Sequence, residues 1–292
     1  MAVRRKSRDG LVMNDAGNLS TREVEGLGER ILAALEAGRQ IAPVTETWPD
    51  LGLEDAYRVS GAIAARRGLR GERIAGWKIG FTNRTIWSEY GVFAPIWGPV
   101  YQHTLGEAGT AQAPGAAAVT AMPEPRIEPE IVFRLRSAPH RGMDEAALFS
   151  CIDAVGHGFE IVQSVYPGWR FRPADTVAAC GLHGRLLLGP MLPVGARPVG
   201  EWLEALRDFT LALMRDGEVV ERGAAENVLG GPVSALRHFV ESFDPHPFAR
   251  GLEPGDVIAT GTVTRALPVA AGQHWSTSVL GLPIGGLGLT IA

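Results

Sequence analysis

Cysteine is scarce in this sequence, and no long apolar run is present. Only two cysteines, Cys151 and Cys180, occur among 292 residues, which fits a reducing compartment better than a disulfide framework. A membrane span needs about 18 or more consecutive apolar residues, and the sequence contains no such run. We therefore expect a cytoplasmic protein with no membrane partner.

An excess of positive charge is also missing, as are several short catalytic signatures. The net charge of -4 and the pI near 6.0 argue against a nucleic-acid partner, which would need a basic face. The sequence has no P-loop, no dinucleotide fingerprint, no G-x-S-x-G elbow and no C-x-x-C pair. None of these motifs therefore identifies the chemistry.

The first residues are basic without being a secretory signal. Arg4, Arg5, Lys6 and Arg8 are not followed by an apolar segment. We expect residues 1–18 to form a disordered basic tail.

A helical region is expected over residues 19–72. Ser20 and Glu23 have the spacing of a capping box, and apolar residues follow at helical intervals, which predicts a helix over residues 21–37. A second helix is expected over residues 53–67, and nothing on either helix indicates chemistry.

The remaining residues, 73–292, are expected to form a strand-rich domain. Abundant glycine (37) and proline (20) favour many turns. Further helices are expected near residues 85–90, 144–153 and 232–243, and a loop over residues 91–98. Strands are expected near residues 74–83, 126–135, 159–163, 185–188, 210–215, 218–222, 256–260, 274–280 and 287–292.

Two glutamates mark the strand expected over residues 126–135. With a period of two, Glu128 and Glu130 fall on one face, about 7 Å apart, and the apolar residues fall on the other. Like charges held in this way favour a hard divalent cation between them. A half-solvated strand surface explains the same alternation, so the pattern alone leaves both interpretations open.

Lys78 and Glu160 are the other charged residues in apolar strands. Lysine is rarely buried without a partner, although a surface lysine can extend its ammonium into water. Glu160 adds a third carboxylate. His157 falls on the opposite strand face from Glu160 and is not counted as a ligand.

Several motifs, in order along the chain, resemble a known family. They are Gly76-Trp77-Lys78-Ile79-Gly80-Phe81-Thr82, Glu128-Pro129-Glu130-Ile131, Phe159-Glu160-Ile161-Val162, and Leu252-Glu253-Pro254-Gly255-Asp256 leading to Thr260-Gly261-Thr262. The chain resembles the 2-keto-4-pentenoate hydratase and 4-oxalocrotonate decarboxylase branch of the fumarylacetoacetate hydrolase superfamily. The resemblance runs from about residue 50 to the C-terminus.

The resemblance implies an α+β fold, with a mixed β-roll or sandwich core and an N-terminal helical region. It implies Mg²⁺ or Mn²⁺ held by Glu128, Glu130 and Glu160, and Lys78 near a small 2-oxo acid substrate. Expected substrate contacts are Gly80, Thr82, Thr260 and Thr262, although the glycine-flanked threonines 260 and 262 could equally form a turn. By analogy we also expect a homo-oligomer.

The sequence departs from the family pattern at several polar positions. Ile96 and Ala179 stand where the family carries acidic residues, and Gln163 replaces a usual aspartate. His183 stands where a small hydroxyl residue is expected. It could supply a titrating catalytic group, or it could be a loop histidine bonded to backbone.

The leading functional interpretation is a metal-dependent hydratase of a 2-hydroxy-dienoate or 2-oxo-enoate from aromatic-compound breakdown. The alternatives are decarboxylation of a 2-oxo-enedioate, C–C hydrolysis, or a non-catalytic metal-binding subunit that partners an active relative. The changed residues at 96, 163 and 179 favour the last of these.

Overall fold

The structure, a computed structural model, describes residues 19–84, 87–90, 92 and 94–292. The expected basic tail 1–18 lies outside the described residues, as do positions 85 and 86 of the expected helix 85–90. The rest of that helix is α4 (Trp87–Tyr90).

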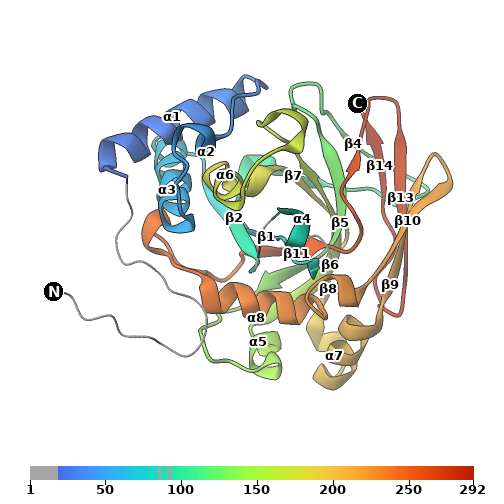
Figure 1. The fold of residues 1–292 in the computed structure, drawn as a ribbon. Helices are drawn as coiled ribbons and strands as arrows, with labels where there is room; N and C mark the ends of the chain where they lie inside the picture. The colour runs from blue at the N-terminus through green and yellow to red at the C-terminus, as the bar shows by residue number, and fades with distance from the viewer. Residues whose placement is uncertain (1–18, 85–86, 91, 93) are drawn as a thin grey trace.

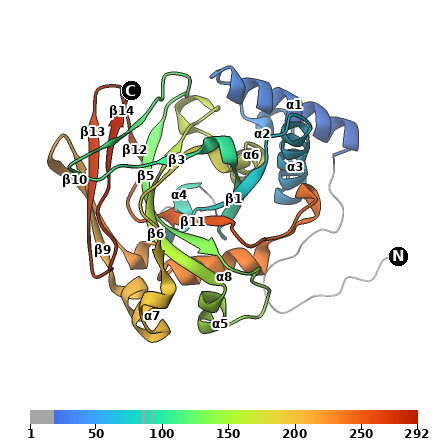
Figure 2. The ribbon, with the colours of Figure 1, turned by 180° about the vertical axis from the view of Figure 1, so that it is seen from behind.

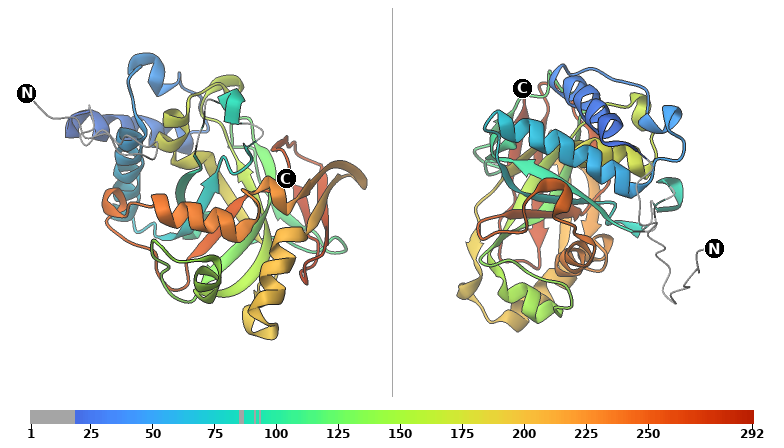
Figure 3. Two further views of the ribbon diagram at one scale, coloured as in Figure 1. Left: turned by 60° about the horizontal axis from the view of Figure 1, so that its bottom comes forward. Right: turned by 90° about the vertical axis from the view of Figure 1, so that its left-hand side faces the viewer.

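Three helices form the N-terminal region. They are α1 (Thr21–Glu36), α2 (Val44–Thr47) and α3 (Leu53–Leu69), so the helices predicted at residues 21–37 and 53–67 are confirmed. The capping box is complete, because Ser20 Oγ accepts from the Glu23 amide while the Glu23 carboxylate accepts from the Ser20 amide. Helices α1 and α3 lie side by side (Figure 3).

The N-terminal helices share their core with a later part of the chain. Helix α6 (Pro173–Ala178) packs against α3. One apolar cluster joins Ile31 and Ile63 to Tyr166, Val177 and Leu182. Residues 165–182 are thereby held between the helices and the sheet.

The larger sheet curls around the site described below (Figure 1). Its main path runs β2-β1-β11-β5-β6-β7-β3, with β12 paired to β5 and β8 paired to β6. The strands are β1 (Ile74–Gly80), β2 (Ile96–Tyr101), β3 (Leu105–Glu107), β5 (Arg126–Leu135), β6 (Ile152–Val162), β7 (His183–Leu188), β8 (Leu192–Pro193), β11 (Val257–Thr262) and β12 (Leu267–Pro268).

A second sheet stands beside the first, with strand order β10-β9-β13-β14-β4 (Figure 2). Its strands are β4 (Gly115–Ala117), β9 (Thr210–Arg215), β10 (Glu218–Ala224), β13 (His274–Leu280) and β14 (Gly288–Ile291). Helices α5 (Glu145–Ser150), α7 (Val199–Asp208) and α8 (Pro232–Ser242) lie together at one end. Mixed helices and curled sheets match the expected α+β class.

The bounds of three predicted elements differ from those in the structure. The helix expected at 144–153 ends at Ser150, and the strand expected at 159–163 already begins at Ile152. Gly156 and Gly158 let neighbouring atoms approach that strand closely, a tertiary effect that local periodicity cannot reveal. The loop expected at 91–98 contains the start of β2 at Ile96, and α7 was not anticipated.

Strand β5 separates the core from the site. Ile127, Ile131, Phe133 and Leu135 are buried in the main apolar cluster, on the face opposite the glutamates. No helix among the described residues is long and apolar enough to cross a membrane.

Candidate active site

Three glutamates converge on the inner face of the curled sheet. The antiparallel register of β5 and β6 places Glu128 directly opposite Glu160, and Glu130 follows two residues along β5. One carboxylate oxygen from each of Glu128, Glu130 and Glu160 lies within 4.8 Å of the others. The structure thus brings together the three residues predicted as metal ligands.

The carboxylates of this cluster differ strongly in pKa. Burial raises the pKa of Glu130 well above its usual range, and the neighbouring glutamates raise it further. Burial also raises the pKa of Glu128 to about 7, against the opposing effect of Lys78. Burial opposes ionisation of Glu160 too, but Lys78 and His183 outweigh it and lower the pKa of Glu160.

Glu130 carries a buried oxygen that the described residues leave unpartnered. Its Oε2 accepts from the Gly261 amide at 2.8 Å, whereas Oε1 has no hydrogen-bond partner in the described part of the chain. A buried carboxylate oxygen without a partner is costly. A divalent cation bound by three carboxylates would satisfy it, so the donor set fits Mg²⁺ or Mn²⁺.

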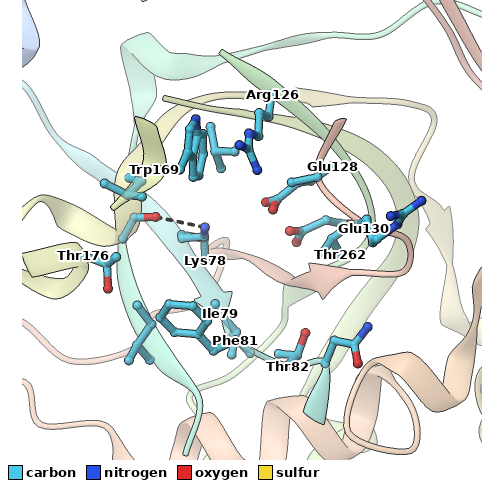
Figure 4. Close-up of a pocket in the computed structure, with 18 of the residues that line it drawn as sticks. Lys78, Ile79, Phe81, Thr82, Arg126, Glu128, Glu130, Trp169, Thr176 and Thr262 are labelled. Atoms are coloured by element: carbon cyan, nitrogen blue, oxygen red, sulfur yellow. Dashed lines mark hydrogen bonds between the residues drawn. The ribbon is translucent and has the colours of Figure 1, made fainter. Parts of the chain in front are cut away.

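Lys78 is buried beside the glutamates. Its Nζ lies 3.1 Å from Glu160 Oε2 and donates to the Gly181 carbonyl at 3.1 Å (Figure 4). Burial disfavours the ammonium form, but Glu160, Glu128 and Glu130 together outweigh burial and raise the pKa of Lys78 above its ordinary value. Lys78 is therefore a buried cation.

A cavity of about 340 Å³ opens onto this cluster. Lys78, Gly80, Thr82, Glu128, Glu130 and Thr262 all line it, among other residues. Its apolar wall includes Phe81, Ile96, Trp169, Phe171 and Leu182. The residue at 96, where the family pattern has an acidic group, therefore presents an apolar side chain to the cavity.

Thr260, predicted as a substrate contact, does not line this cavity. Its side chain is fully buried, and its hydroxyl donates to the Ile131 carbonyl at 2.8 Å. The register of β11 against β5 shifts between Ala259 and Thr262, where Gly261 has a φ of +104°, so the regular alternation of the strand is interrupted and Thr262 is the cavity threonine on this strand.

His183 does not line the cavity either. Its Nδ1 lies 2.8 Å from Glu160 Oε1, and its Nε2 lies 2.8 Å from Thr104 Oγ1. The histidine faces a separate cavity behind Glu160, which Tyr101 and Gln163 also line. It is therefore placed to orient Glu160, and its predicted role as a catalytic group stays a prediction.

His157 lies behind the cluster, as its strand position predicts. Its Nδ1 donates to the Glu130 carbonyl at 2.9 Å, and its Nε2 accepts from Thr277 Oγ1 at 2.9 Å. The Thr277 hydroxyl oxygen accepts from the Leu287 amide, so its proton is directed to the histidine.

Sequence reasoning missed two features of the site. The Gly181 carbonyl fixes Lys78 from a turn far along the chain, and no local pattern identifies it. Arg126 lines the cavity, and its position two residues before Glu128 in a period-two strand was a usable signal.

Comparison with known proteins gives a consistent picture. A family model described as fumarylacetoacetate (FAA) hydrolase C-terminal matches residues 116–290. The chain is 28% identical over 260 residues to a 2-hydroxyhexa-2,4-dienoate hydratase of Comamonas testosteroni, covering 89% of this chain and 94% of the relative. It is 29% identical over 265 residues to a 4-oxalocrotonate decarboxylase of Pseudomonas sp. (strain CF600), covering 90% and 96%.

Solved structures show the same similarity. The 4-oxalocrotonate decarboxylase from Pseudomonas putida G7, complexed with magnesium and adipate, superimposes with a TM-score of 0.85 and 28% identity, covering 95% of this chain and 100% of that one. A fumarylpyruvate hydrolase from Pseudomonas aeruginosa, in complex with Mn²⁺ and pyruvate, matches with a TM-score of 0.52 and 15% identity, covering 74% and 88%. The second likeness concerns the fold alone.

Proposed function

The chain belongs to the fumarylacetoacetate hydrolase family, and on this premise we propose that it is a metal-dependent lyase of short 2-oxo acids. The leading reaction is hydration of a 2-hydroxy-dienoate or 2-oxo-enoate from aromatic-compound breakdown. The single observation that supports it best is the cluster of Glu128, Glu130 and Glu160 beside the Lys78 cation at a ligand-sized cavity.

The proposed cofactor is Mg²⁺ or Mn²⁺, held by the three glutamates. Such an ion, when bound, polarises the two oxygens of a 2-oxo acid and stabilises negative charge that develops on the 2-oxygen. The relative complexed with magnesium supports this assignment.

Lys78 is proposed to bind the acid rather than to act as a base. Its ammonium has three N–H groups, donates a hydrogen bond to the Gly181 carbonyl and forms an ion pair with Glu160. This leaves donor capacity for an anionic substrate in the cavity. In the metal-free protein the three glutamates raise the pKa of Lys78, so this residue is a charged donor at the cavity.

The apolar wall is proposed to exclude bulk water from the reacting carbons. Phe81, Trp169 and Phe171 line the cavity together with the charged residues, and Figure 4 shows Phe81 and Trp169 across the cavity from Glu130. Removing water in this way strengthens the electrostatic contacts of Lys78 with a bound acid.

Decarboxylation of a 2-oxo-enedioate is the second candidate. It is favoured by the structural similarity to a 4-oxalocrotonate decarboxylase over 95% of this chain. C–C hydrolysis is less well supported, because the hydrolase structure matches with a TM-score of only 0.52. A non-catalytic subunit is the alternative from another class, because Ile96 removes an expected acidic group from the cavity.

One assay separates these functions. The purified protein is incubated with Mg²⁺ and a panel of 2-hydroxy-dienoates with and without a terminal carboxylate. We expect loss of dienol absorbance. Loss without CO₂ release indicates hydration, and loss accompanied by CO₂ release indicates decarboxylation. Glu130→Gln, which removes one proposed ligand, should abolish turnover.

Oxalate, which imitates the chelating end of a 2-oxo acid, reports on the site independently of turnover. We expect oxalate to bind only when Mg²⁺ is present. Metal-dependent oxalate binding with no turnover of any substrate would favour the non-catalytic subunit. Oxalate binding that persists in EDTA would contradict the proposed metal site.

The family resemblance leads us to propose a homo-oligomer, and the scarcity of cysteine leads us to propose a cytoplasmic location. Light scattering after size exclusion would measure the mass against the 31.2 kDa of one chain.

A further inference from the structure

Arg126 lies in one row with the proposed metal ligands. In strand β5, residues 126, 128 and 130 point to the same face, with about 7 Å between successive members. The register places Arg126 opposite Val162 and Glu128 opposite Glu160, and both Arg126 and Val162 line the cavity. Figure 4 shows Arg126 beside Trp169, on the far side of Glu128 from Glu130.

The guanidinium of Arg126 has an aromatic partner and no acidic one among the described residues. It lies over the Trp169 ring, 4.1 Å from the ring centroid. Within the described part of the chain, no carboxylate lies within the 4.0 Å of an ion pair. Stacking occupies the face of the guanidinium and leaves its in-plane N–H groups for a carboxylate.

The neighbouring acidic residues do not pair directly with Arg126. Glu124 accepts hydrogen bonds at Oε1 from Gln40 and from the Gly168 amide. Glu128 belongs to the carboxylate cluster. The partly buried Arg126 lowers the pKa of both glutamates through space without forming an ion pair with either, so an anion at the edge of the cavity could bind its N–H groups.

A second arginine at the same cavity provides a contrast. Arg265 also lines the cavity, but its Nε donates to Glu221 at 2.6 Å, and its side chain is 74% exposed. Its charge is both paired and solvated, so it has no need of a ligand. Arg126 is distinguished by burial, stacking and the absence of such a pair.

We propose that Arg126 binds a second carboxylate at the far end of the substrate, so that the preferred substrates are 2-oxo-enedioates. This inference rests on the proposed function, in which the three glutamates and their ion hold the 2-oxo acid end. A six-carbon chain with bonds of about 1.5 Å spans roughly 6 Å between its terminal carbons. That length corresponds to the step of about 7 Å from Glu128 to Arg126.

The consequence is selectivity against substrates with an apolar end. A methyl terminus would displace water from Arg126 without replacing its hydrogen bonds. A carboxylate would form charge-assisted bonds to the same N–H groups, and these are among the strongest that a protein makes. The site would thus distinguish two acids that differ only at their last carbon.

The test uses 2-oxoadipate and 2-oxohexanoate, a matched pair that differs only in the terminal carboxylate. Both lack the conjugated double bond, so their binding can be measured without turnover. Isothermal titration calorimetry with Mg²⁺ should show that the unmodified protein binds 2-oxoadipate at least about tenfold more tightly. Arg126→Met should remove this preference and leave 2-oxohexanoate affinity within about twofold. Arg126→Lys should retain part of it.

Two arginine variants serve as controls. Arg134 lies on the same strand and pairs with Asp153, so Arg134→Gln removes a β5 arginine without touching the cavity. Arg265→Gln removes the other arginine at the cavity. Both should keep the preference for 2-oxoadipate, and circular dichroism would verify that all variants are folded.

The outcomes separate this inference from the function on which it rests. Equal affinity of the unmodified protein for the two acids would overturn the assignment of Arg126. Loss of the preference in Arg265→Gln, or its persistence in folded Arg126→Met, would do the same. If oxalate also fails to bind with Mg²⁺, the chelating site itself is wrong and the proposed function fails with it.

Discussion

At the scale of single residues, the charge of Lys78 compensates only part of the carboxylate cluster. Three buried or half-buried glutamates without a cation would repel one another strongly. Lys78 contacts Glu160 directly and lowers the pKa of Glu160, whereas burial raises those of Glu128 and Glu130. One lysine thus stabilises a single carboxylate and leaves the other two dependent on a further cation.

Lys78→Met should separate substrate handling from metal binding. We expect kcat/KM to fall at least about 100-fold, because a charged donor to the bound acid is lost. Mg²⁺ affinity should be retained or increased, since a positive charge beside the ligands is removed. Steady-state kinetics and Mg²⁺ titration measure the two effects, and an unchanged turnover rate would remove Lys78 from the site.

At the scale of elements, the end of β11 fixes a carboxylate through a backbone amide. Gly261 adopts a φ of +104°, and its amide donates to Glu130 Oε2 at 2.8 Å. A Cβ at this position would lie 2.1 Å from Thr82 Oγ1. Only glycine therefore lets β11 approach both Glu130 and Thr82, which follows the end of β1.

Gly261→Ala should weaken metal binding by about 10- to 100-fold, the usual cost of losing a partner that orients a ligand. Gly272→Ala is the matched control, because Gly272 also has a positive φ of +87° but a Cβ there meets nothing within 4 Å. Titration with Mg²⁺ measures the difference. If the two variants bind Mg²⁺ equally tightly, the contact between the Gly261 amide and Glu130 does not determine the Mg²⁺ affinity.

At the scale of the whole molecule, His157 joins the two sheets behind the site. It bonds to Glu130 in the curled sheet and to Thr277 in the second sheet. Burial lowers the pKa of His157 to about 4, so the folded protein holds this ring neutral. The site is thereby braced against the second sheet through an uncharged histidine.

Acid should destabilise the metal-free protein through His157. The pKa of His157 in the folded protein lies below the ordinary 6.5, so the unfolded chain binds the proton first as the pH is lowered. The free energy of unfolding therefore decreases as the pH falls from 6.5 to about 4. A shift of this size corresponds to roughly 3 kcal/mol. Urea unfolding in EDTA across this range should show a smaller pH effect for His157→Asn. Parallel curves for the two proteins would contradict this prediction.

Mg²⁺ should stabilise the whole fold, and more so at higher pH. The raised pKa of Glu128, about 7, means that its stabilising protonated form is lost as pH rises through 7 in the metal-free protein. The ionised form is the metal ligand, so metal binding strengthens over the same range. At about 100 times the dissociation constant, the ion contributes about 2.7 kcal/mol.

Thermal unfolding with Mg²⁺ or EDTA would check this at pH 6 and pH 8. The increase in Tm with Mg²⁺ should be larger at pH 8, and Glu128→Gln should lose most of it. An equal increase at both pH values would show that Glu128 does not control metal binding.

The sequence by itself determined the local chemistry of this protein. Period-two alternation in residues 126–135 separated Glu128 and Glu130 from the apolar face, and the family motifs added Glu160 and Lys78. The capping box and helical spacing located the first helices. These features depend on residues close together in the chain, where geometry follows from backbone periodicity.

Only the tertiary structure decided which of these groups meet and in what state of charge. The β5–β6 register brings Glu128 opposite Glu160, and the Gly181 turn fixes Lys78. Pairing with Glu160 places His183 behind the carboxylate cluster, and stacking on Trp169 distinguishes Arg126. Register, burial and partner charges arise between segments distant in sequence, so no local pattern specifies them.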